Sequence, residues 1–433
     1  MTKPPLRLGL AGVGTVGQGL VQILGSNSAW VERRLGRKVA ISAVAVRDAS
    51  KPRGVALHQG TALLTDPLAL AEREDVDIVV ELMGGTAAAR QLITMALSAG
   101  KHVVTANKHL LAEHGQELFA LAGEKKVGLY YEASVCGAIP IVATLRESLA
   151  GNHILAVTGI LNGTSNYILS RMTAKGLSYD QALRKAQKKG YAEADPYLDV
   201  EGFDAAHKLI MLIRLAHGRH YPLAQLPVMG ISSISPQDIA YAREFGCQIK
   251  LIGQAQVVDG RISAGVHPMI LSDAYLLAQV HGAFNAVRVV GDACGAVMLY
   301  GQGAGGLPTG SAVLADIMGL ARDGCAPNNT GFPEQVLPLA DILPPDQETT
   351  PRYFRFTVED KPGVLAGLAG ALGAHDISIH QMVQKVDPQA PDTSVVPIVV
   401  MTHAARQKDV LGALAQIRSF TFNKAEPVHL RVL

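Results

Sequence analysis

Leu6-Arg-Leu-Gly-Leu-Ala-Gly-Val-Gly-Thr-Val-Gly17 is the stretch of sequence that decides the fold. Its apolar first part predicts a short buried strand, and residues 20–24 continue with the spacing of a helix. A strand, a GxGxxG motif and a helix in this order are typical of a dinucleotide-binding unit, although other parallel α/β turns can carry such glycines. The first glycine allows a tight turn, the second lets the main chain approach a pyrophosphate, and the third permits close helix packing. The residues expected to contact the cofactor are Gly12, Gly14, Thr15, Val16 and Gly17.

The composition indicates a multidomain protein of nearly neutral charge. The 433 residues predict two or three domains at roughly 150 residues each, and 48% of them are hydrophobic. Lys and Arg number 39 against 37 for Asp and Glu, so we expect no nucleic-acid partner and no anionic membrane surface. No apolar run reaches the roughly 18 residues of a membrane helix. The spacing of Cys136, Cys247, Cys294 and Cys325 fits neither a zinc site nor a disulfide framework, so we expect a cytoplasmic protein.

Strands and helices alternate through the first third of the chain. Strands are predicted at 39–46, 76–82, 101–105 and 127–132, which indicates a parallel sheet with ligands beyond the carboxyl ends of its strands. Arg47 follows the second of these strands, where an Arg can pair with the 2′-phosphate of NADP, so we favour NADP over NAD. Asp48 comes one position late for the acidic residue that binds the ribose of NAD. A simple pair between Arg47 and Asp48 in a solvated loop is the alternative.

Two further strand ends carry candidate ligands. Thr105 and Lys108 follow one strand, and Lys108 is either a functional residue or a surface lysine that opens the next helix. After the strand at 127–132, a turn runs from Glu132 to Pro140 with mostly apolar side chains. Its main-chain carbonyls could hold a hard monovalent cation such as Na⁺, because hard cations prefer oxygen ligands.

From residue 151 the pattern changes to that of an α+β insert. A carboxylate-rich loop, from Tyr191 to Asp204, precedes a helix predicted at 205–216 that is otherwise apolar. Asp204 and Lys208 are four residues apart and share one face of this helix, a spacing that most often makes a surface ion pair. The neighbouring loop favours a functional pair instead. Carboxylates suit a substrate ammonium, and a lysine suits proton transfer to a carbonyl oxygen that gains charge.

The last third predicts a helix, a linker and a small module. Gly301 to Gly306 has no predicted strand directly before it, and Thr309-Gly-Ser311 is expected to cap a helix at 312–321 that packs back on the first domain. Residues 326–350 are Pro-rich and polar, which is typical of a linker. The order βαββαβ over residues 352–433 fits a ferredoxin-like module. The expected domains are 1–135 with 301–340, then 136–300, then 350–433.

Several of these segments resemble one enzyme family. The stretch from Ala186 to Lys208, which ends in Gly202-Phe-Asp-Ala-Ala-His-Lys208, closely resembles the signature of the homoserine dehydrogenases. Segments 12–17, 105–108, 162–166 and 303–305 resemble that family in the same order, and Asp360-Lys-Pro-Gly-Val-Leu365 resembles an ACT domain. The resemblance covers nearly the whole chain. It implies an α/β fold with a Rossmann-type NAD(P)-binding domain, an α+β catalytic and dimerisation domain, and a C-terminal ferredoxin-like ACT domain.

The resemblance also implies an activity and a set of roles. The family reduces L-aspartate 4-semialdehyde to L-homoserine with NAD(P)H, in threonine, methionine and isoleucine biosynthesis. Lys208 would donate the proton to the aldehyde oxygen, with Lys108 near substrate and nicotinamide. Glu193 and Asp204 would bind the substrate, Glu193 through the substrate ammonium. Gly190 and Gly305 would contact the cofactor. The Na⁺ loop of the family matches Glu132 with the carbonyls of Val135, Gly137 and Ile139.

The ACT resemblance implies feedback inhibition by threonine, so deletion of residues 346–433 is expected to abolish inhibition and leave catalysis. Asp376 stands where many ACT domains carry Asn, so the chain departs from the family pattern at the expected effector contact. The resemblance further implies the monofunctional form of the enzyme, without a fused aspartate kinase, and a homodimer or homotetramer.

The sequence disfavours two other functions. An ACT-domain sensor that has lost its chemistry is disfavoured because Lys108, Glu193, Asp204 and Lys208 are all present. Another NADP-linked semialdehyde oxidoreductase would need a cysteine nucleophile. Cys136 lies in the expected cation loop, and the carboxylate-rich loop contains no cysteine.

Overall fold

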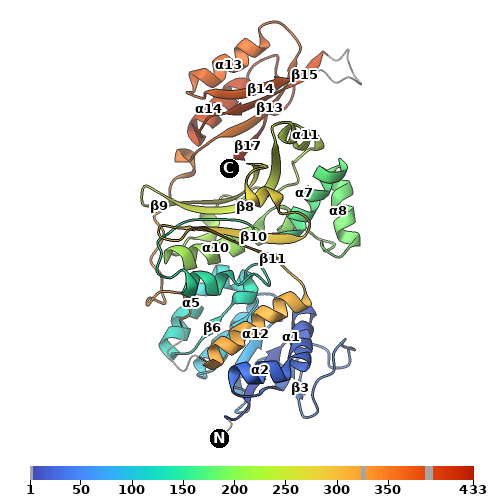
Figure 1. Ribbon diagram of the computed structural model, residues 1–433, viewed down its shortest axis with the longest axis vertical. Coiled ribbons are helices and arrows are strands. Elements are labelled where there is room, and N and C mark those ends of the chain that lie inside the picture. Colours follow the sequence, from blue (N-terminus) through green and yellow to red (C-terminus); the bar gives the residue numbers. More distant parts are fainter. Residues whose placement is uncertain (1–2, 323–327, 386–393) are drawn as a thin grey trace. The chain divides into compact units, whose positions relative to one another are not determined.

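In the computed structural model (Figure 1), the stretch from Leu6 to Gly17 forms β1 (Leu6–Ala11), a turn at residues 12–14 and the start of α1 (Thr15–Ser26). The structure describes residues 3–322, 328–385 and 394–433, so Cys325 lies outside the described residues. The chain forms two compact units. The first contains residues 1–163, 203–226 and 283–340, and the second contains 164–202, 227–282 and 341–433. The domain boundaries expected from the sequence stay a prediction.

The N-terminal part of the first unit is a parallel sheet. Its strand order is β3-β2-β1-β4-β5-β6, which is the order of a Rossmann dinucleotide-binding sheet. The strands beside β1 are β2 (Val39–Ala45), β3 (Ala62–Leu64), β4 (Ile78–Glu81), β5 (His102–Thr105) and β6 (Leu129–Tyr130). The connecting helices are α2 (Ser28–Leu35), α3 (Ala69–Glu72), α4 (Ala87–Ser98) and α5 (Lys108–Lys125). The expected fold class is therefore confirmed, and β3 is an edge strand that the sequence pattern did not indicate.

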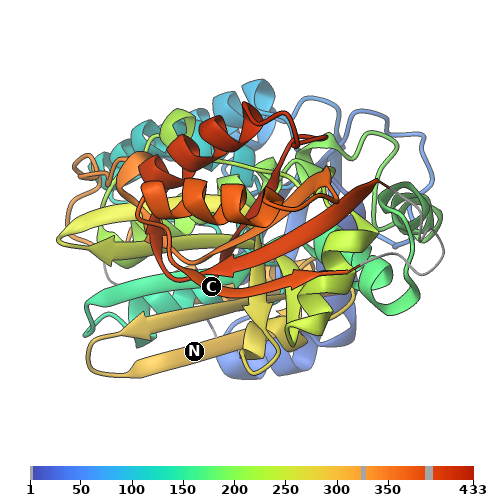
Figure 2. The same ribbon diagram turned by 90° about the horizontal axis from the view of Figure 1, so that it is seen from above.

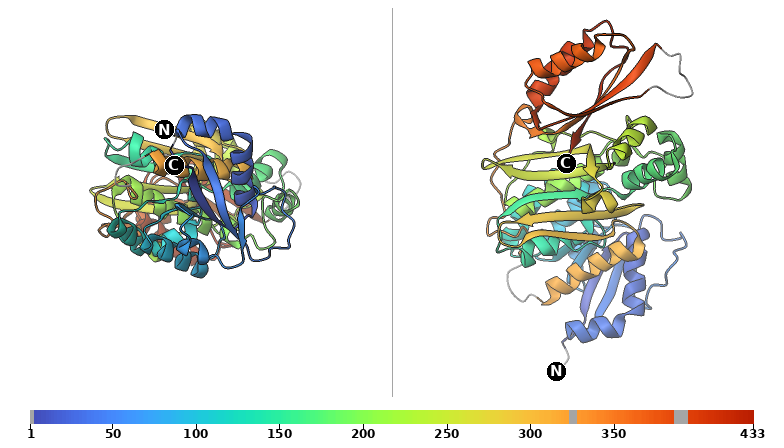
Figure 3. Two further views of the ribbon diagram at one scale, coloured as in Figure 1. Left: turned by 90° about the horizontal axis from the view of Figure 1, so that it is seen from below. Right: turned by 45° about the horizontal axis from the view of Figure 1, so that its top comes forward.

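A helix from late in the sequence completes this part. The helix α12 (Gly306–Arg322) packs against α1, and the right-hand view of Figure 3 shows it beside the N-terminal strands. The two backbones are so close that a Cβ on Gly19 would lie 2.0 Å from the carbonyl oxygen of Gly306. The prediction that this helix packs back on the N-terminal region is confirmed. Residues 312–318 add Ala312, Val313, Leu314, Ile317 and Met318 to the core of the sheet.

Two details of this region were predicted wrongly. The helix begins at Gly306 rather than at residue 312, because Pro308 is tolerated in the first turn, where an amide donor is not needed. A strand, β11 (Gly295–Gln302), directly precedes it and forms an antiparallel hairpin with β10 (Phe284–Gly291). Gly295, Gly301 and the exposed residues of β11 gave no alternating apolar pattern, so the strand escaped detection.

The rest of the first unit surrounds a buried helix. β10 also pairs with β7 (Ile154–Ile160), and α10 (Phe203–His217) has nearly every residue from 204 to 216 buried. After the turn at 132–140 the chain forms one turn of α-helix, α6 (Ile141–Ala143), followed by a π turn, η2 (Thr144–Ser148). A short 3₁₀ turn, η1 (Glu132–Ser134), replaces the end of the expected strand at 127–132.

The second unit contains a sheet in the order β8-β9-β17-β13-β15-β14. β8 (Cys247–Val258) and β9 (Arg261–Ser272) form a long antiparallel hairpin. The helices of this part are α7 (Gly163–Lys175), α8 (Tyr179–Lys188), α9 (Tyr197–Val200) and α11 (Pro236–Glu244). Ser178 and Gln181 form a capping box at the start of α8.

The C-terminal module has the βαββαβ order expected from the sequence. Its strands β13 (Arg352–Glu359), β14 (Ile379–Gln384), β15 (Val395–Thr402) and β17 (Val428–Val432) pair as β17-β13-β15-β14, which confirms the ferredoxin-like fold. Figure 2 shows the helices α13 (Val364–Ala374) and α14 (Gln407–Arg418) together above these strands. β17 also pairs with β9, so the module shares a continuous sheet with the hairpin. Among the helices that the structure describes, none has the length and apolar character to cross a membrane.

Candidate active site

The glycine-rich loop has the geometry that its three glycines predict. Gly12 has φ +96°, and a Cβ there would lie 2.7 Å from the carbonyl oxygen of Leu82. A Cβ on Gly17 would lie 2.5 Å from the oxygen of Gly12, whereas a Cβ on Gly14 would meet nothing within 4 Å. Gly12 and Gly17 are therefore required by the fold, and Gly14 opens onto free space at the N-terminus of α1. Such a helix end favours a pyrophosphate through its amides and its dipole.

A second helix end lies beside this loop. A Cβ on Gly306 would lie 2.9 Å from the carbonyl oxygen of Thr15, so α12 begins next to the first turn of α1. Gly305, with φ +124°, immediately precedes α12. The first turns of two helices thus meet near Gly14, Thr15 and Val16, which strengthens the prediction of anion binding there.

The two other cofactor candidates in this sheet differ in accessibility. Arg47 is exposed two residues beyond the end of β2. Asp48 is committed to Ser50, whose amide and hydroxyl both donate to its Oδ1, at 2.9 and 2.6 Å. Thr105 is buried at the end of β5, where its hydroxyl donates to Glu81 and accepts the amide of Asn107. Arg47 is therefore available to a ligand, Asp48 is engaged locally, and Thr105 shapes the turn that leads to Lys108.

Three charged residues meet in the first unit. Asp204 on α10 accepts a hydrogen bond from Lys208 at 2.7 Å through Oδ2, and its Oδ1 lies 2.9 Å from Nζ of Lys108 on α5. The side chains of Asp204 and Lys208 are each 10% exposed, whereas that of Lys108 is 36% exposed. The pair at 204 and 208 is therefore not a surface ion pair, and Lys108 joins it from about 100 residues away in the sequence. One carboxylate serves two ammonium groups.

The partners of this carboxylate keep it ionised. Burial raises the pKa of Asp204, but the charges of Lys208 and Lys108 and the hydrogen bonds from Lys208 and Asn162 outweigh burial and hold the pKa well below its usual range. The Asn162 amide donates to Oδ2 of Asp204 at 2.8 Å. Asp204 is thus a permanent counter-ion for the two lysines.

Main-chain and amide groups fix the second lysine. Nζ of Lys208 donates to the carbonyl oxygen of Leu161 at 2.6 Å, and the side-chain amide of Asn285 donates to the same oxygen at 2.8 Å. Asn285 is completely buried. Sequence reasoning missed Leu161, whose contribution is a carbonyl without any side-chain signature, and missed Asn285, which comes from a distant strand. Asn162 lies in segment 162–166, which resembles the family but to which no functional role was assigned from the sequence.

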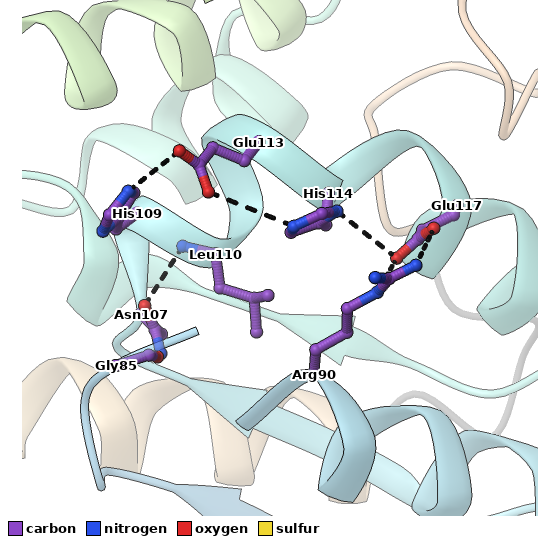
Figure 4. Close-up of polar contacts among 8 residues, drawn as sticks. All are labelled: Gly85, Arg90, Asn107, His109, Leu110, Glu113, His114 and Glu117. Carbon is purple, nitrogen blue, oxygen red and sulfur yellow. Dashed lines mark hydrogen bonds and ion pairs between the residues drawn. The ribbon is translucent and has the colours of Figure 1, made fainter. Parts of the chain in front are cut away.

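The first lysine is positioned by the start of α5. Asn107 caps this helix by accepting the amide of Leu110 at 3.1 Å, and its own side chain donates to the carbonyl of Gly85 at 2.6 Å (Figure 4). His109 stacks on His207 of α10 with ring centroids 4.7 Å apart. Burial, together with the charge of His109, lowers the pKa of His207 to about 4, so the ring beside Lys208 in sequence is neutral at physiological pH.

Glu113 on α5 contacts His109 at 3.0 Å, and Figure 4 shows a row of polar side chains that continues along the helix through His114 and Glu117 to Arg90 on α4. These contacts are at least one-third exposed, so each adds little to stability. Of these contacts, the Arg90–Glu117 pair joins α5 to α4, and the others lie within α5.

Two predicted ligands belong to the second unit. Glu193 is exposed on the loop after α8, and its carbonyl oxygen accepts a hydrogen bond from Gln187 at 3.2 Å. Gly190 has φ +74° and donates its amide to Gln187, so it ends the helix in a left-handed conformation that favours glycine. The side chain of Glu193 is available to a ligand. Its role at the substrate, and that of Gly190 at the cofactor, stay predictions.

The expected cation loop is a tight double turn. The amide of Val135 donates to the carbonyl of Glu132 and the amide of Ile139 donates to that of Cys136, while Cys136 and Gly137 have φ 57° and 58°. The Glu132 carboxylate accepts the amides of Val142 and Ala143 at 2.9 and 2.8 Å. Burial raises the pKa of Glu132 to about 7. A cation here would therefore be held mainly by main-chain oxygens, which suits a hard monovalent ion.

Cys136 has no features of a nucleophile. Its side chain is completely buried, and burial raises the pKa of its thiol. Reactive cysteines are exposed thiolates with lowered pKa values. This observation disfavours an oxidoreductase that uses a cysteine nucleophile here.

A dinucleotide-binding sheet joined to a Lys–Asp–Lys cluster, of which Asp204 and Lys208 are buried, defines a nicotinamide-dependent oxidoreductase. Family models for homoserine dehydrogenase match residues 140–318, for the homoserine dehydrogenase NAD binding domain residues 12–132, and for the ACT domain residues 352–420. The chain belongs to the homoserine dehydrogenase family.

Individual relatives agree over nearly the whole length. Homoserine dehydrogenase of Neisseria gonorrhoeae is 42% identical over 96% of this chain and 95% of that protein. The crystal structure of a homoserine dehydrogenase from Thiobacillus denitrificans has a TM-score of 0.93 and 41% identity, covering 100% of this chain and 99% of that one. A hyperthermophilic archaeal homoserine dehydrogenase in complex with NADPH has a TM-score of 0.63 and 27% identity, covering 74% of this chain and 99% of that chain.

Proposed function

We propose that this homoserine dehydrogenase reduces L-aspartate 4-semialdehyde to L-homoserine with NADPH, reversibly, in the biosynthesis of threonine, methionine and isoleucine. The observation that carries the proposal is the cluster in which buried Asp204 holds both Lys208 and Lys108. A bound nicotinamide supplies the hydride. The protein must bind the aldehyde, orient its carbonyl and deliver one proton to the oxygen.

Lys208 is the proposed proton donor. Its ammonium is fixed by Asp204 and by the Leu161 carbonyl, so the group is oriented before any substrate arrives. As the carbonyl carbon gains the hydride, the oxygen gains negative charge, and a proton from Nζ turns it into the hydroxyl of the product. Lys108, which is more exposed, adds a second positive charge that favours the same developing oxyanion. The neutral amine of Lys208 then regains a proton from solvent.

From the resemblance, two carboxylates are proposed to bind the substrate. Glu193 would bind the substrate ammonium. Asp204 would contact the substrate while it holds the two lysines. The assay that tests the whole proposal follows the aldehyde-dependent loss of NADPH absorbance by the purified protein. Absence of turnover in folded protein would reject the proposed reaction.

Arg47 is proposed to select NADPH. It is exposed beyond β2, whereas the carboxylate that would bind the ribose of NADH, Asp48, is engaged with Ser50. Replacing Arg47 with Ala removes a charge-assisted contact to the 2′-phosphate, so the KM for NADPH should rise about 10-fold and that for NADH should barely change. Initial rates with both cofactors measure this. An equal effect on both KM values would show that Arg47 does not bind the 2′-phosphate of NADPH.

A monovalent cation is proposed in the turn after η1. Glu132 and the carbonyls of Val135, Gly137 and Ile139 would hold it, and the tight double turn described above supports this assignment. The ion would stabilise a loop that leads into α6 and would take no part in the chemistry.

Threonine is proposed to inhibit the enzyme through the ACT module. Deletion of residues 346–433 would also remove β17, which pairs with β9, so a point substitution is the cleaner test. Asp376 is exposed in a turn, and its backbone has φ +56°, a conformation that glycine adopts readily. We expect Asp376→Gly to weaken threonine inhibition about 10-fold without changing kcat, measured as rate against threonine concentration. A wild-type enzyme that threonine does not inhibit would remove the regulatory proposal.

A homodimer or homotetramer and a cytoplasmic location also remain proposals, supported by the resemblance and by the cysteine usage respectively. Sedimentation of the purified protein would give the oligomer size.

A further inference from the structure

A polar cavity of about 510 Å³ lies in the second unit, on one face of the β8–β9 hairpin. Alternate residues of β9 line it, Ser263, Gly265, His267 and Met269, as expected when one face of a strand points into a hollow. The segment from Leu343 to Thr350 and the start of α14 complete its wall. None of these residues belongs to the Lys108–Asp204–Lys208 cluster.

The strand register concentrates positive charge at this face. Arg431 of β17 pairs with Met269 of β9, and Arg352 of β13 pairs with Arg431. Residues directly opposite each other in neighbouring strands share a face, so the two guanidinium groups lie on the side that carries His267 and Met269. Like charges opposite each other on a sheet are unfavourable, which makes this arrangement costly unless something compensates it.

A single carboxylate serves these two arginines, and its oxygens are already engaged. Glu348 accepts a hydrogen bond from Arg431 at 2.7 Å and another from the Ser263 hydroxyl at 2.8 Å. Arg352 is 1% exposed, and its Nε and Nη2 atoms lack hydrogen-bond partners among the described residues. Arg352 does not itself line the cavity but lies beside the lining residue Arg431 on the same face of the sheet, so the two guanidinium groups share one carboxylate.

Two further polar groups at the cavity are also unsatisfied in the described part of the chain. The buried hydroxyl of Thr350 has no partner, and neither ring nitrogen of His267 has one, although the residue is only 9% exposed. Burial lowers the pKa of His267 well below its usual value, and so do the charges of Arg431, Arg352 and His429, so its ring is neutral and offers one N–H donor. Native proteins leave few buried polar groups unsatisfied, so this concentration at one cavity calls for a ligand.

The charges that line the cavity are mixed. Four cations, Arg261, Arg406, Lys408 and Arg431, lie there with three carboxylates, Asp259, Asp346 and Glu348, so cations are in excess by one. Arg406 contacts Asp409 at 3.4 Å and Arg261 donates to Gln347, so both cations also have partners of their own. The volume lies within the range of small-molecule sites, so a compact metabolite would fit.

We propose that this cavity binds a small metabolite through a carboxylate or phosphate group, which supplies the acceptor that Arg352 lacks. The oxyanion accepts from the guanidinium of Arg352 and from the donors of Thr350 and His267. A charge-assisted contact to a buried guanidinium is strong, and the anion neutralises the repulsion between Arg352 and Arg431. The proposal does not depend on the proposed reaction, because it concerns binding alone.

Isothermal titration of the full-length protein tests this proposal with three probes at constant ionic strength: inorganic phosphate, succinate and L-threonine. We expect at least one probe to bind once per chain with a Kd below about 1 mM. Binding of phosphate alone would identify a phosphate group as the ligand chemistry, and binding of succinate or threonine would identify a carboxylate.

Variants connect that binding to the cavity. Arg352→Met should weaken the bound probe at least 10-fold, because the uncompensated charge is removed, and Thr350→Val should weaken it about 3-fold with little change of shape. Arg184→Met makes the same chemical change at an exposed position of α8 and should bind like the wild type. Thr350→Val keeps the test decisive if Arg352→Met does not fold. The proposal is overturned if no probe binds below 10 mM, or if both cavity variants bind as tightly as the wild type.

Discussion

Replacing Lys208 with Ala should lower kcat at least ~100-fold, which is the lower end of the contribution of a positioned general acid. The substitution removes the only group in the cluster that is held by both the Asp204 carboxylate and the Leu161 carbonyl. The KM for NADPH should change little, because the cofactor is assigned to the glycine-rich loop. Steady-state rates at saturating aldehyde and NADPH give both parameters.

The matched control for this variant is Lys185→Ala, an equal truncation at an exposed position of α8. It should retain the wild-type kcat. Circular dichroism of both variants distinguishes lost chemistry from lost folding. A folded Lys208→Ala protein with full activity would show that another group delivers the proton.

Replacing Asp204 with Asn should lower kcat/KM at least ~100-fold and also destabilise the fold, by about 3 kcal/mol or more. The substitution preserves the shape of the side chain but leaves Lys208, and in part Lys108, without a counter-ion. An amide NH₂ would in addition face an ammonium group at a distance that now holds an ion pair, 2.7 to 2.9 Å. Breaking a buried pair costs more than the pair contributes, because the remaining charge stays desolvated.

The measurements for this variant are kcat/KM and the free energy of unfolding in urea. Asp180→Asn makes the same change at an exposed position in the first turn of α8, and both quantities should stay close to wild type. Activity that survived in Asp204→Asn together with normal stability would mean that the cluster is not required to hold the two lysines.

The sequence predicted those contacts of the site that follow from the spacing of residues along one helix. Asp204 and Lys208 share a helix face whatever surrounds them, so their pairing was predictable. The contact of Lys108 with Asp204 depends on how α5 packs against α10, and no local sequence pattern predicts that packing. The Leu161 carbonyl and the Asn285 amide were invisible for a related reason: the first has no side-chain signature, and the second reaches the site only through strand pairing.

The fold, too, was predictable where the local sequence pattern is strong and was not predictable elsewhere. Strong apolar runs and the GxGxxG motif predicted the parallel sheet, and the βαββαβ order predicted the C-terminal module. β11 was missed because glycines and exposed residues broke its alternation. The start of α12 was predicted too late because Thr309-Gly-Ser311 was expected to cap the helix, whereas these residues lie inside it. The π turn after α6 has no known sequence signal. Each miss lies where the tertiary structure overrides a weak local preference.

The packing of α12 on α1 has a consequence for synthesis. The sheet strands are complete when β6 has emerged, but the helix that covers Leu20 and Val21 follows roughly 190 residues later. At about 5–20 residues per second, the nascent N-terminal region waits roughly 10–40 s with part of its apolar face uncovered. During that interval it is a substrate for chaperones, and mutations that loosen the Gly19–Gly306 contact should reduce the yield of soluble protein more than they reduce the activity of what folds.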